Sequence, residues 1–257
     1  MASQLPPNQK NCSLRCIQLR SVNLHLFSKY LTACGDENQI YLWNLANPKR
    51  NLELHAHSKK CSQVCFSPNE NILASASHDC TINLWYPGTN IKTKTIKGHT
   101  GPVLCIDFSI DGKMILSGCT DKTIKLWDID TLKFKSSYVG HTNWVTCAKM
   151  SPDMNLICSG GEDKKIFIWD QTKKKHIQKY DTFDEPITKT IFHPKEPWVI
   201  SSTKNKNMSI HDLREEKIVQ HYEAHHDSIN DIAVHPSGNF VTSVSGNSEI
   251  KVFFCSM

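Results

Sequence analysis

The sequence contains no long apolar run. Its N-terminus, Met1 to Asn11, is polar and includes Pro6 and Pro7, so it has neither the apolar segment of a signal peptide nor that of a membrane span. We therefore expect a protein of the cytosol or nucleus with no membrane partner.

The sequence also lacks the short motifs of nucleotide-using enzymes, since it has neither a Gly-rich phosphate loop nor a Walker-type lysine motif. A disulfide framework is not indicated, because the chain has an odd number of cysteines, 11, and no secretory signal. Most of them, including Cys61, Cys105, Cys147 and Cys158, lie in strand patterns where a small apolar side chain fits. We expect free, buried thiols, no cofactor and no small-molecule substrate.

Charge of one sign is only mildly in excess. The net charge of +5 comes largely from lysines and favours acidic partner surfaces. An interleaved pattern of basic and aromatic residues, which a nucleic-acid-binding face would show, is missing. The hypothesis of a nucleic-acid scaffold therefore rests on the charge balance alone. Lysines on outer strands are explained by the protection of sheet edges against pairing with other sheets.

The sequence does contain an internal repeat of 42 residues. Four columns keep this step without a gap, and the column of the third strand reads Trp43, Trp85, Trp127, Trp169, His211 and Phe253. A repeat of about 40 to 45 residues with Gly-His and Trp-Asp signals is typical of WD-repeat propeller blades. We therefore predict an all-β fold, a WD-repeat β-propeller with six recognisable blades.

The repeats predict one domain, residues 1–257, with blades at about 19–54, 61–97, 103–139, 145–181, 187–223 and 229–257. Residues 9–14 fall where a closing outer strand would be expected, although Pro6, Pro7 and the polar run after them make a poor strand. Two arrangements stay open: a closed six-bladed ring, or a truncated seven-bladed propeller with a free edge.

Histidine, serine and aspartate recur in the repeat columns with the residue types of a hydrolase triad. Three copies in register with a tryptophan argue against catalysis, since an enzyme needs one site. In WD-repeat proteins, which these repeats resemble, such residues form a hydrogen-bonded chain that holds the blade together. The three sets are His57, Ser75, Asp79 and Trp85; His99, Ser117, Asp121 and Trp127; and His141, Ser159, Asp163 and Trp169.

A zinc site at His55, His57, Cys61 and Cys65 is the other chemical candidate. All four are ligand types, but their spacing matches no common zinc pattern, and His57 and Cys61 already belong to repeat columns. We therefore predict no metal site.

One column at the entry to the inner strand suggests a partner-binding surface. It reads Gln18, Lys60, Pro102, Trp144, Pro186 and Ser228, so Trp144 is an aromatic where the other repeats have no large apolar residue. We take Trp144 and Lys60 as candidate contacts, with cover of a neighbouring loop as the equal alternative for Trp144. Trp198 aligns with apolar residues of other repeats and is expected in the core.

Three stretches resemble the proteome-of-centriole-one WD-repeat proteins. They are Asn143 to Asp153 (NWVTCAKMSPD), Gln220 to His225 (QHYEAH) and His235 to Phe240 (HPSGNF). The resemblance implies a non-catalytic scaffold of centrioles, basal bodies or ciliary axonemes, located in the cytoplasm and cytoskeleton and bound to tubulin or microtubule-associated proteins. Family members usually have a seventh blade and a C-terminal coiled coil, which this sequence lacks.

A second class of function stays open. His211-Asp212-Leu213-Arg214 resembles the Trp-Asp-x-Arg box with which some WD-repeat substrate receptors attach to cullin-type ubiquitin ligases. Histidine replaces the tryptophan, so the match is partial. This alternative makes Arg214 a candidate contact.

Overall fold

The computed structural model describes residues 19–25, 30–47, 51–69, 71–87 and 92–255. The predicted closing strand, residues 9–14, and Gln18 lie outside them. Within the described residues all regular structure is β, and no helix long and apolar enough to cross a membrane is present there. Six antiparallel sheets follow one another along the chain. This confirms the predicted all-β propeller of six blades.

Each sheet is built from consecutive strands. The first blade has β1 (Leu19–Leu24), β2 (Tyr30–Gly35), β3 (Gln39–Asn44) and β4 (Leu52–His55), and the second has β5 (Cys61–Phe66), β6 (Leu73–Ser77), β7 (Thr81–Trp85) and β8 (Lys92–Lys97). The third has β9 (Val103–Phe108), β10 (Met114–Cys119), β11 (Thr123–Asp128) and β12 (Phe134–Val139), and the fourth has β13 (Val145–Met150), β14 (Leu156–Gly161), β15 (Ile166–Asp170) and β16 (Lys175–Tyr180). The fifth has β17 (Ile187–Phe192), β18 (Trp198–Thr203), β19 (Asn207–Asp212) and β20 (Lys217–Glu223), and the sixth has β21 (Ile229–Val234), β22 (Phe240–Ser245) and β23 (Ile250–Phe254).

The turn between β9 and β10 shows why the third blade has glycine there. Gly112 has a φ of +72°, a conformation that L side chains rarely adopt. A Cβ at this position would lie 2.8 Å from Ser67 Oγ of the second blade. Glycine therefore serves both the turn and the close approach of two blades.

The core lies between blades rather than inside any one of them. Leu116 and Leu126 of the third blade share one apolar cluster with Val145 and Ile157 of the fourth. Each blade is a single sheet that buries its faces only by stacking on neighbours. Trp198 is 7% exposed, as predicted for a core residue, and the described cysteines are free and mostly buried.

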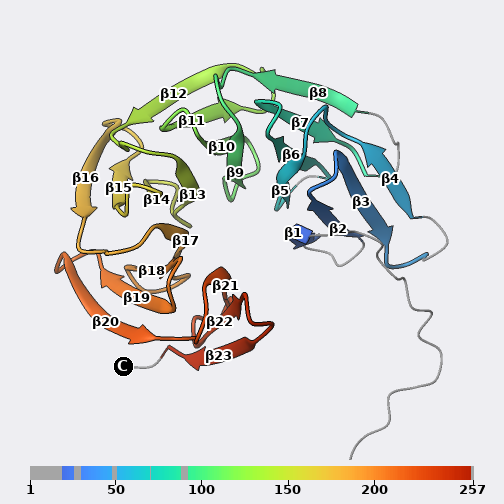
Figure 1. Ribbon diagram of the computed structural model, residues 1–257. Helices are drawn as coiled ribbons and strands as arrows, with labels where there is room; N and C mark the ends of the chain where they lie inside the picture. The colour runs from blue at the N-terminus through green and yellow to red at the C-terminus, as the bar shows by residue number, and fades with distance from the viewer. Residues whose placement is uncertain (1–18, 26–29, 48–50, 70, 88–91, 256–257) are drawn as a thin grey trace, which may run out of the picture.

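The six blades form an open arc in the described part of the chain. Figure 1 shows β1–β4 and β21–β23 at its two ends, with β1 and β21 both at the inner side. The sixth sheet has three strands in the order β21-β22-β23, whereas each of the other five has four. The described residues therefore do not form the closed six-bladed ring that was one of the two predicted arrangements.

Candidate partner-binding surfaces

Antiparallel strands divide the loops between two faces of the propeller. The loops that precede each innermost strand lie on the same side as the turns between second and third strands, and we call this side the entry face. The turns between first and second strands and between third and fourth strands lie on the opposite side, the exit face. Trp144 and Lys60 precede β13 and β5, so they lie on the entry face, whereas Arg214 follows β19 and lies on the exit face.

The third blade shows the hydrogen-bonded chain in full. His99 Nδ1 lies 2.8 Å from Asp121 Oδ2, and His99 Nε2 lies 2.8 Å from Ser117 Oγ. Trp127 Nε1 donates to the same Ser117 oxygen over 2.8 Å. The second and fourth blades repeat this arrangement, with Trp85 Nε1 3.0 Å from Ser75 Oγ and Trp169 Nε1 2.9 Å from Ser159 Oγ.

Burial and charge explain why these chains serve structure. Burial alone would raise the pKa of Asp121, but hydrogen bonds from His99 and Thr123 outweigh it and hold the pKa well below its usual range. The Ser117 side chain is fully buried, so a substrate has no access to its hydroxyl. The carboxylate orients the imidazole, the imidazole orients the serine, and the serine accepts from the indole, so each buried polar group is paired.

The fifth and sixth blades keep only part of the chain. In the fifth, His211 Nε2 lies 2.9 Å from Ser201 Oγ, and the turn histidine is replaced by Phe183. In the sixth, His225 Nε2 lies 2.6 Å from Ser243 Oγ, and Phe253 has no ring N–H to donate. These two blades therefore have fewer polar links than the three regular ones.

The zinc candidate is not assembled as a site. His57 is bonded to Asp79 and Ser75, while Cys61 is buried in an apolar cluster between the first and second blades. Among the described residues, the group of ligand types that does converge is His99, Cys119 and Asp121, with ligand atoms within 4.8 Å of one another. Both nitrogens of His99 are already hydrogen-bonded, and burial raises the pKa of Cys119 to about 12, which disfavours the thiolate that a metal needs. The donor set therefore fits the blade's own hydrogen bonds better than a metal.

Trp144 is half-exposed on the entry face, with 51% of its surface open. Its backbone N–H donates to Asn143 Oδ1, and its carbonyl accepts from the N–H of Glu162 over 2.8 Å. Lys204 Nζ lies 3.3 Å from Glu162 Oε1, so a cation from the fifth blade stands beside the Trp144 loop. Backbone hydrogen bonds thus hold a loop that presents an exposed indole, and the Lys204–Glu162 ion pair adjoins this loop.

Lys60 lies in the same column, two blades away. Its side chain is 38% exposed, and its Nζ lies 3.8 Å from Asp36 Oδ1, which Arg20 Nε also contacts at 2.5 Å. The structure therefore places Lys60 and Trp144 on one face but in separate blades, and it does not bring Arg214 to them.

Arg214 is 65% exposed on the exit face and pairs with Asp212, with Nη2 3.2 Å from Oδ2. The Asp212 carboxylate also accepts from Trp198 Nε1 at 3.3 Å. Hydrogen bonds from Arg214 lower the pKa of Asp212 to about 2. The guanidinium is thus anchored at one edge and open to solvent at the other.

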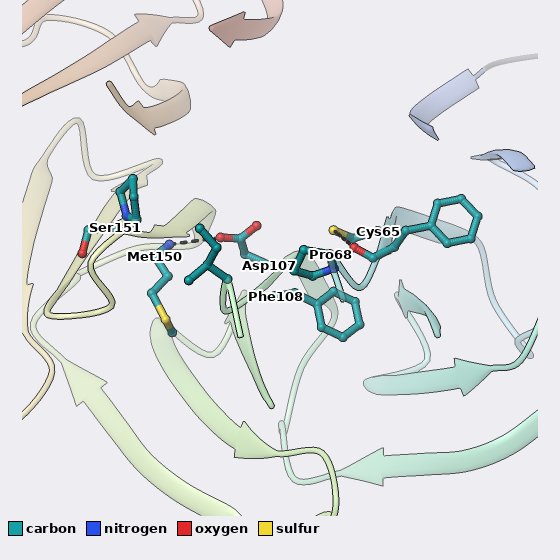
Figure 2. A pocket seen from close by; sticks show the side chains of 9 residues that line it. Cys65, Pro68, Asp107, Phe108, Met150 and Ser151 are labelled. Carbon is teal, nitrogen blue, oxygen red and sulfur yellow. Dashed lines mark hydrogen bonds between the residues drawn. The ribbon is translucent and has the colours of Figure 1, made fainter. Parts of the chain in front are cut away.

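The exit face has a hollow of about 300 Å³ that the sequence analysis did not predict. It is lined by inner-strand ends and turns of the second, third and fourth blades, including Phe66, Phe108 and Met150. Figure 2 shows the Asp107 carboxylate among these side chains, with its bond to the Met150 backbone drawn. Lys149 Nζ lies 2.6 Å from Asp107 Oδ1. The sequence signal was available, because Asp107 and Lys149 are opposite charges one repeat apart in neighbouring inner strands.

Asp107 and Lys149 join two blades at the inner edge. Burial alone would lower the pKa of Lys149, but the nearby Asp107 carboxylate outweighs it and raises the pKa. The Asp107 Oδ2 atom also accepts from the Met150 N–H at 3.0 Å. The second and third blades are linked in a similar way, by Gln63 Oε1 and the Ile106 N–H at 2.9 Å. The polar groups in the hollow are thus used to join blades.

Comparison with known proteins gives one family. The family described as WD domain, G-beta repeat, matches residues 48–86, 90–128, 132–170 and 216–253, which make up more than half of the chain. A WD repeat-containing protein WDS homolog of Arabidopsis thaliana is 39% identical over 71 residues, or 27% of this chain and 14% of the relative. Nuclear distribution protein nudF 1 of Talaromyces marneffei is 36% identical over 72 residues, or 28% of this chain and 16% of the relative.

Protein groucho of Drosophila melanogaster is 30% identical over 102 residues, which are 39% of this chain and 14% of the relative. The matches thus span a small part of each relative's length. The repeated sheets, the hydrogen-bonded chains and the family match together show that this chain belongs to the WD-repeat family.

Proposed function

We propose that this chain is a non-catalytic interaction scaffold of centrioles, basal bodies or ciliary axonemes, in the cytoplasmic cytoskeleton. The coarser part follows from the family, since WD-repeat propellers are generally platforms that bind proteins. The finer part is supported by the resemblance of residues 143–153, 220–225 and 235–240 to the proteome-of-centriole-one proteins. The observation that carries the proposal is the exposure of Trp144. This residue belongs to the first of these stretches, and 51% of its surface is exposed.

The chemistry around Trp144 favours an acidic protein surface with an apolar element. Lys204 and Lys206 on the same face are 59% and 40% exposed. Rim lysines raise the rate of encounter with acidic partners, while a large aromatic at the centre of a contact supplies most of the affinity. Tubulin, whose tails are acidic, and microtubule-associated proteins are the proposed partners.

Cosedimentation with stabilised microtubules tests this proposal. We expect the folded chain to pellet at low salt and to be released as the ionic strength rises, because exposed charges are screened. Trp144→Ala should weaken binding about tenfold or more without changing the thermal midpoint. The matched control is Tyr86→Ala, a 43% exposed aromatic that follows β7 on the exit face and should bind as the unmodified chain does. Failure of the folded chain to pellet at low salt would refute direct microtubule contact.

A second candidate function is a substrate receptor of a cullin-type ubiquitin ligase. It is favoured by the Asp212–Arg214 pair, which presents an anchored and 65% exposed guanidinium. If this function is correct, Arg214→Ala abolishes capture of the ligase adaptor, whereas Arg20→Ala, which removes a half-exposed arginine from the other face, leaves it intact. Equal adaptor capture by the two variants would rule out this contact.

A further inference from the structure

The sixth blade exposes a face that every other blade buries. We define the sixth-blade face as Val244, Ile250 and Val252. Ile250 is 72% exposed, while the residues at the same position in the five other blades are at most 1% exposed: Ile40, Ile82, Ile124, Ile166 and Met208. Val252 is 59% exposed, against at most 4% for its equivalents Leu42, Leu84, Leu126, Ile168 and Ile210. The repeat therefore places an apolar interface here and leaves it uncovered.

The first blade shows the complementary defect. We define the first-blade face as Leu19, Val22 and Leu24, which are 46%, 53% and 54% exposed. The equivalents of Val22 are at most 6% exposed, and they are Val64, Ile106, Ala148, Thr190 and Ile232. The inner strand of the first blade is thus open at positions that the other inner strands bury, except that Val234, the equivalent of Leu24 in the sixth blade, is half-buried.

These two faces are the two halves of one repeated contact. Between the first and second blades, Ile40 and Leu42 pack in one cluster with Cys61, Val64 and Phe66. Ile250 and Val252 occupy the positions of Ile40 and Leu42, and Leu19, Val22 and Leu24 occupy the positions of the other three. Figure 1 shows the strands that carry these residues, β1 and β22–β23, in the blades at the two ends of the arc. A sheet placed between them would make the same contact twice, once on each side.

The edge of the sixth blade adds a third feature. In the other blades the third strand pairs with an outer strand, as β19 pairs with β20 from Asn207↔Glu223 to Asp212↔Lys217. In the described residues β23 pairs with β22 alone, so the backbone groups on its outer edge have no strand partner there. An open edge of this kind accepts an added strand.

We propose that one β-sheet blade from polypeptide outside residues 1–257 occupies the opening between the first-blade and sixth-blade faces. This blade is apolar on both sides and contributes an outer strand that pairs antiparallel with β23. The longest segment of this sequence outside the described residues, 1–18, is too short to supply it, since a four-strand blade here takes residues 103–139.

Hydrogen exchange of the full chain, followed by mass spectrometry, tests the proposal with a blade of known sequence. The probe is a separate polypeptide of residues 130–171, which carries β12 to β15 and continues the 42-residue step after Cys255. We expect β1 and β23 to exchange rapidly in the chain alone. With the probe present, exchange at both strands should slow at least about tenfold, because the amides become paired or covered. A probe with Ile168→Asp should give no such protection at β1.

Substitutions in the full chain locate the contact. Ile250→Asp and Val22→Asp should each weaken probe binding about tenfold or more. Val139→Asp is the matched control, because Val139 is 71% exposed on the outer strand β12 and lies outside both faces. A fusion that carries residues 130–171 directly after Cys255 guards against failure of the probe to fold, and it should show the same protection of β1 and β23.

Three results would overturn the proposal. The first is slow exchange of β1 and β23 in the monomer alone, which means that the ring closes on itself. The second is protection that appears only as the chain dimerises, which makes a second copy the occupant. The third is rapid exchange of both strands with the probe present and in the fusion.

Discussion

His211 should make this protein lose stability in mildly acidic solution. The imidazole is 0% exposed and lies against Tyr180 and Phe183, with ring centroids 4.6 Å and 5.6 Å away. Its Nε2 contacts Ser201 Oγ, while its Nδ1 has no hydrogen-bond partner among the described residues. Burial, with a smaller contribution from the charge of His221, lowers the pKa of His211 from 6.5 to about 4. The folded protein therefore keeps this ring neutral where the unfolded chain protonates it.

The sign and size of the effect follow from proton linkage. Above pH 6.5 the His211 ring is neutral in both states and the free energy of unfolding is at its full value. As the pH falls from 6.5 towards 4, the free energy of unfolding decreases, because the unfolded state binds a proton at His211 that the folded state does not. Between pH 7.5 and 4.5 the loss amounts to about 2.5 kcal/mol in the free energy of unfolding. His211→Phe removes the group that binds this proton. Phenylalanine already occupies the equivalent position in the sixth blade, as Phe253.

Urea unfolding of both proteins at pH 7.5 and pH 4.5 measures the effect. The unmodified chain should lose about 2.5 kcal/mol more than the variant over this interval, since all other titrating groups are common to both. His211→Trp, which restores the residue of the regular blades, should behave as the phenylalanine variant does. Equal pH dependence in all three proteins would refute the argument that a neutral, buried His211 sets this slope.

Two further predictions concern the polar groups between and within blades. Ser117→Ala leaves Trp127 Nε1 and His99 Nε2 without their buried partner and should lower the free energy of unfolding by about 2–4 kcal/mol in urea titrations. Ser243→Ala should cost about half as much, because Phe253 donates nothing to that serine, and equal costs would contradict the ranking. Asp107→Ala leaves the Lys149 ammonium and the Met150 N–H without their acceptor and should cost about 1–3 kcal/mol. Asp107→Asn keeps a neutral acceptor and should recover part of the loss, so a larger loss for asparagine would count against the reasoning.

Much of the fold was readable from the repeat. A step of 42 residues that returns tryptophan, serine and aspartate to their columns predicts identical sheets stacked side by side, because one such sheet cannot bury both faces alone. The hydrogen-bonded chain was readable for the same reason, since His99, Ser117 and Asp121 recur with constant spacing. The exposure of Trp144 on a loop could be suspected from its column, but whether a neighbouring loop covered it could not.

Other features depend on distances between blades, which a periodic pattern does not encode. The Asp107–Lys149 pair requires two inner strands to approach until the atoms are 2.6 Å apart, and its two residues break the apolar column instead of following it. The pKa of His211 depends on the Tyr180 and Phe183 rings around it, which come from a neighbouring strand and loop. The charges of Asp107 and Lys149, one repeat apart, could have suggested a pair, but only the structure shows that the atoms meet. The surroundings of His211 have no local sequence signal, because they arise where separate segments meet.

The sequence by itself determined the number of blades, their strand order and the residues that hold each blade together, because these follow from local patterns repeated at a constant step. Only the tertiary structure decided that the described part of the chain forms an arc that is open between β1 and β23. Closure depends on the angle between successive blades, which accumulates from side-chain packing at every interface. Ile250 belongs to a column that is buried in every other blade, and it is 72% exposed because no sheet in the described chain lies against it.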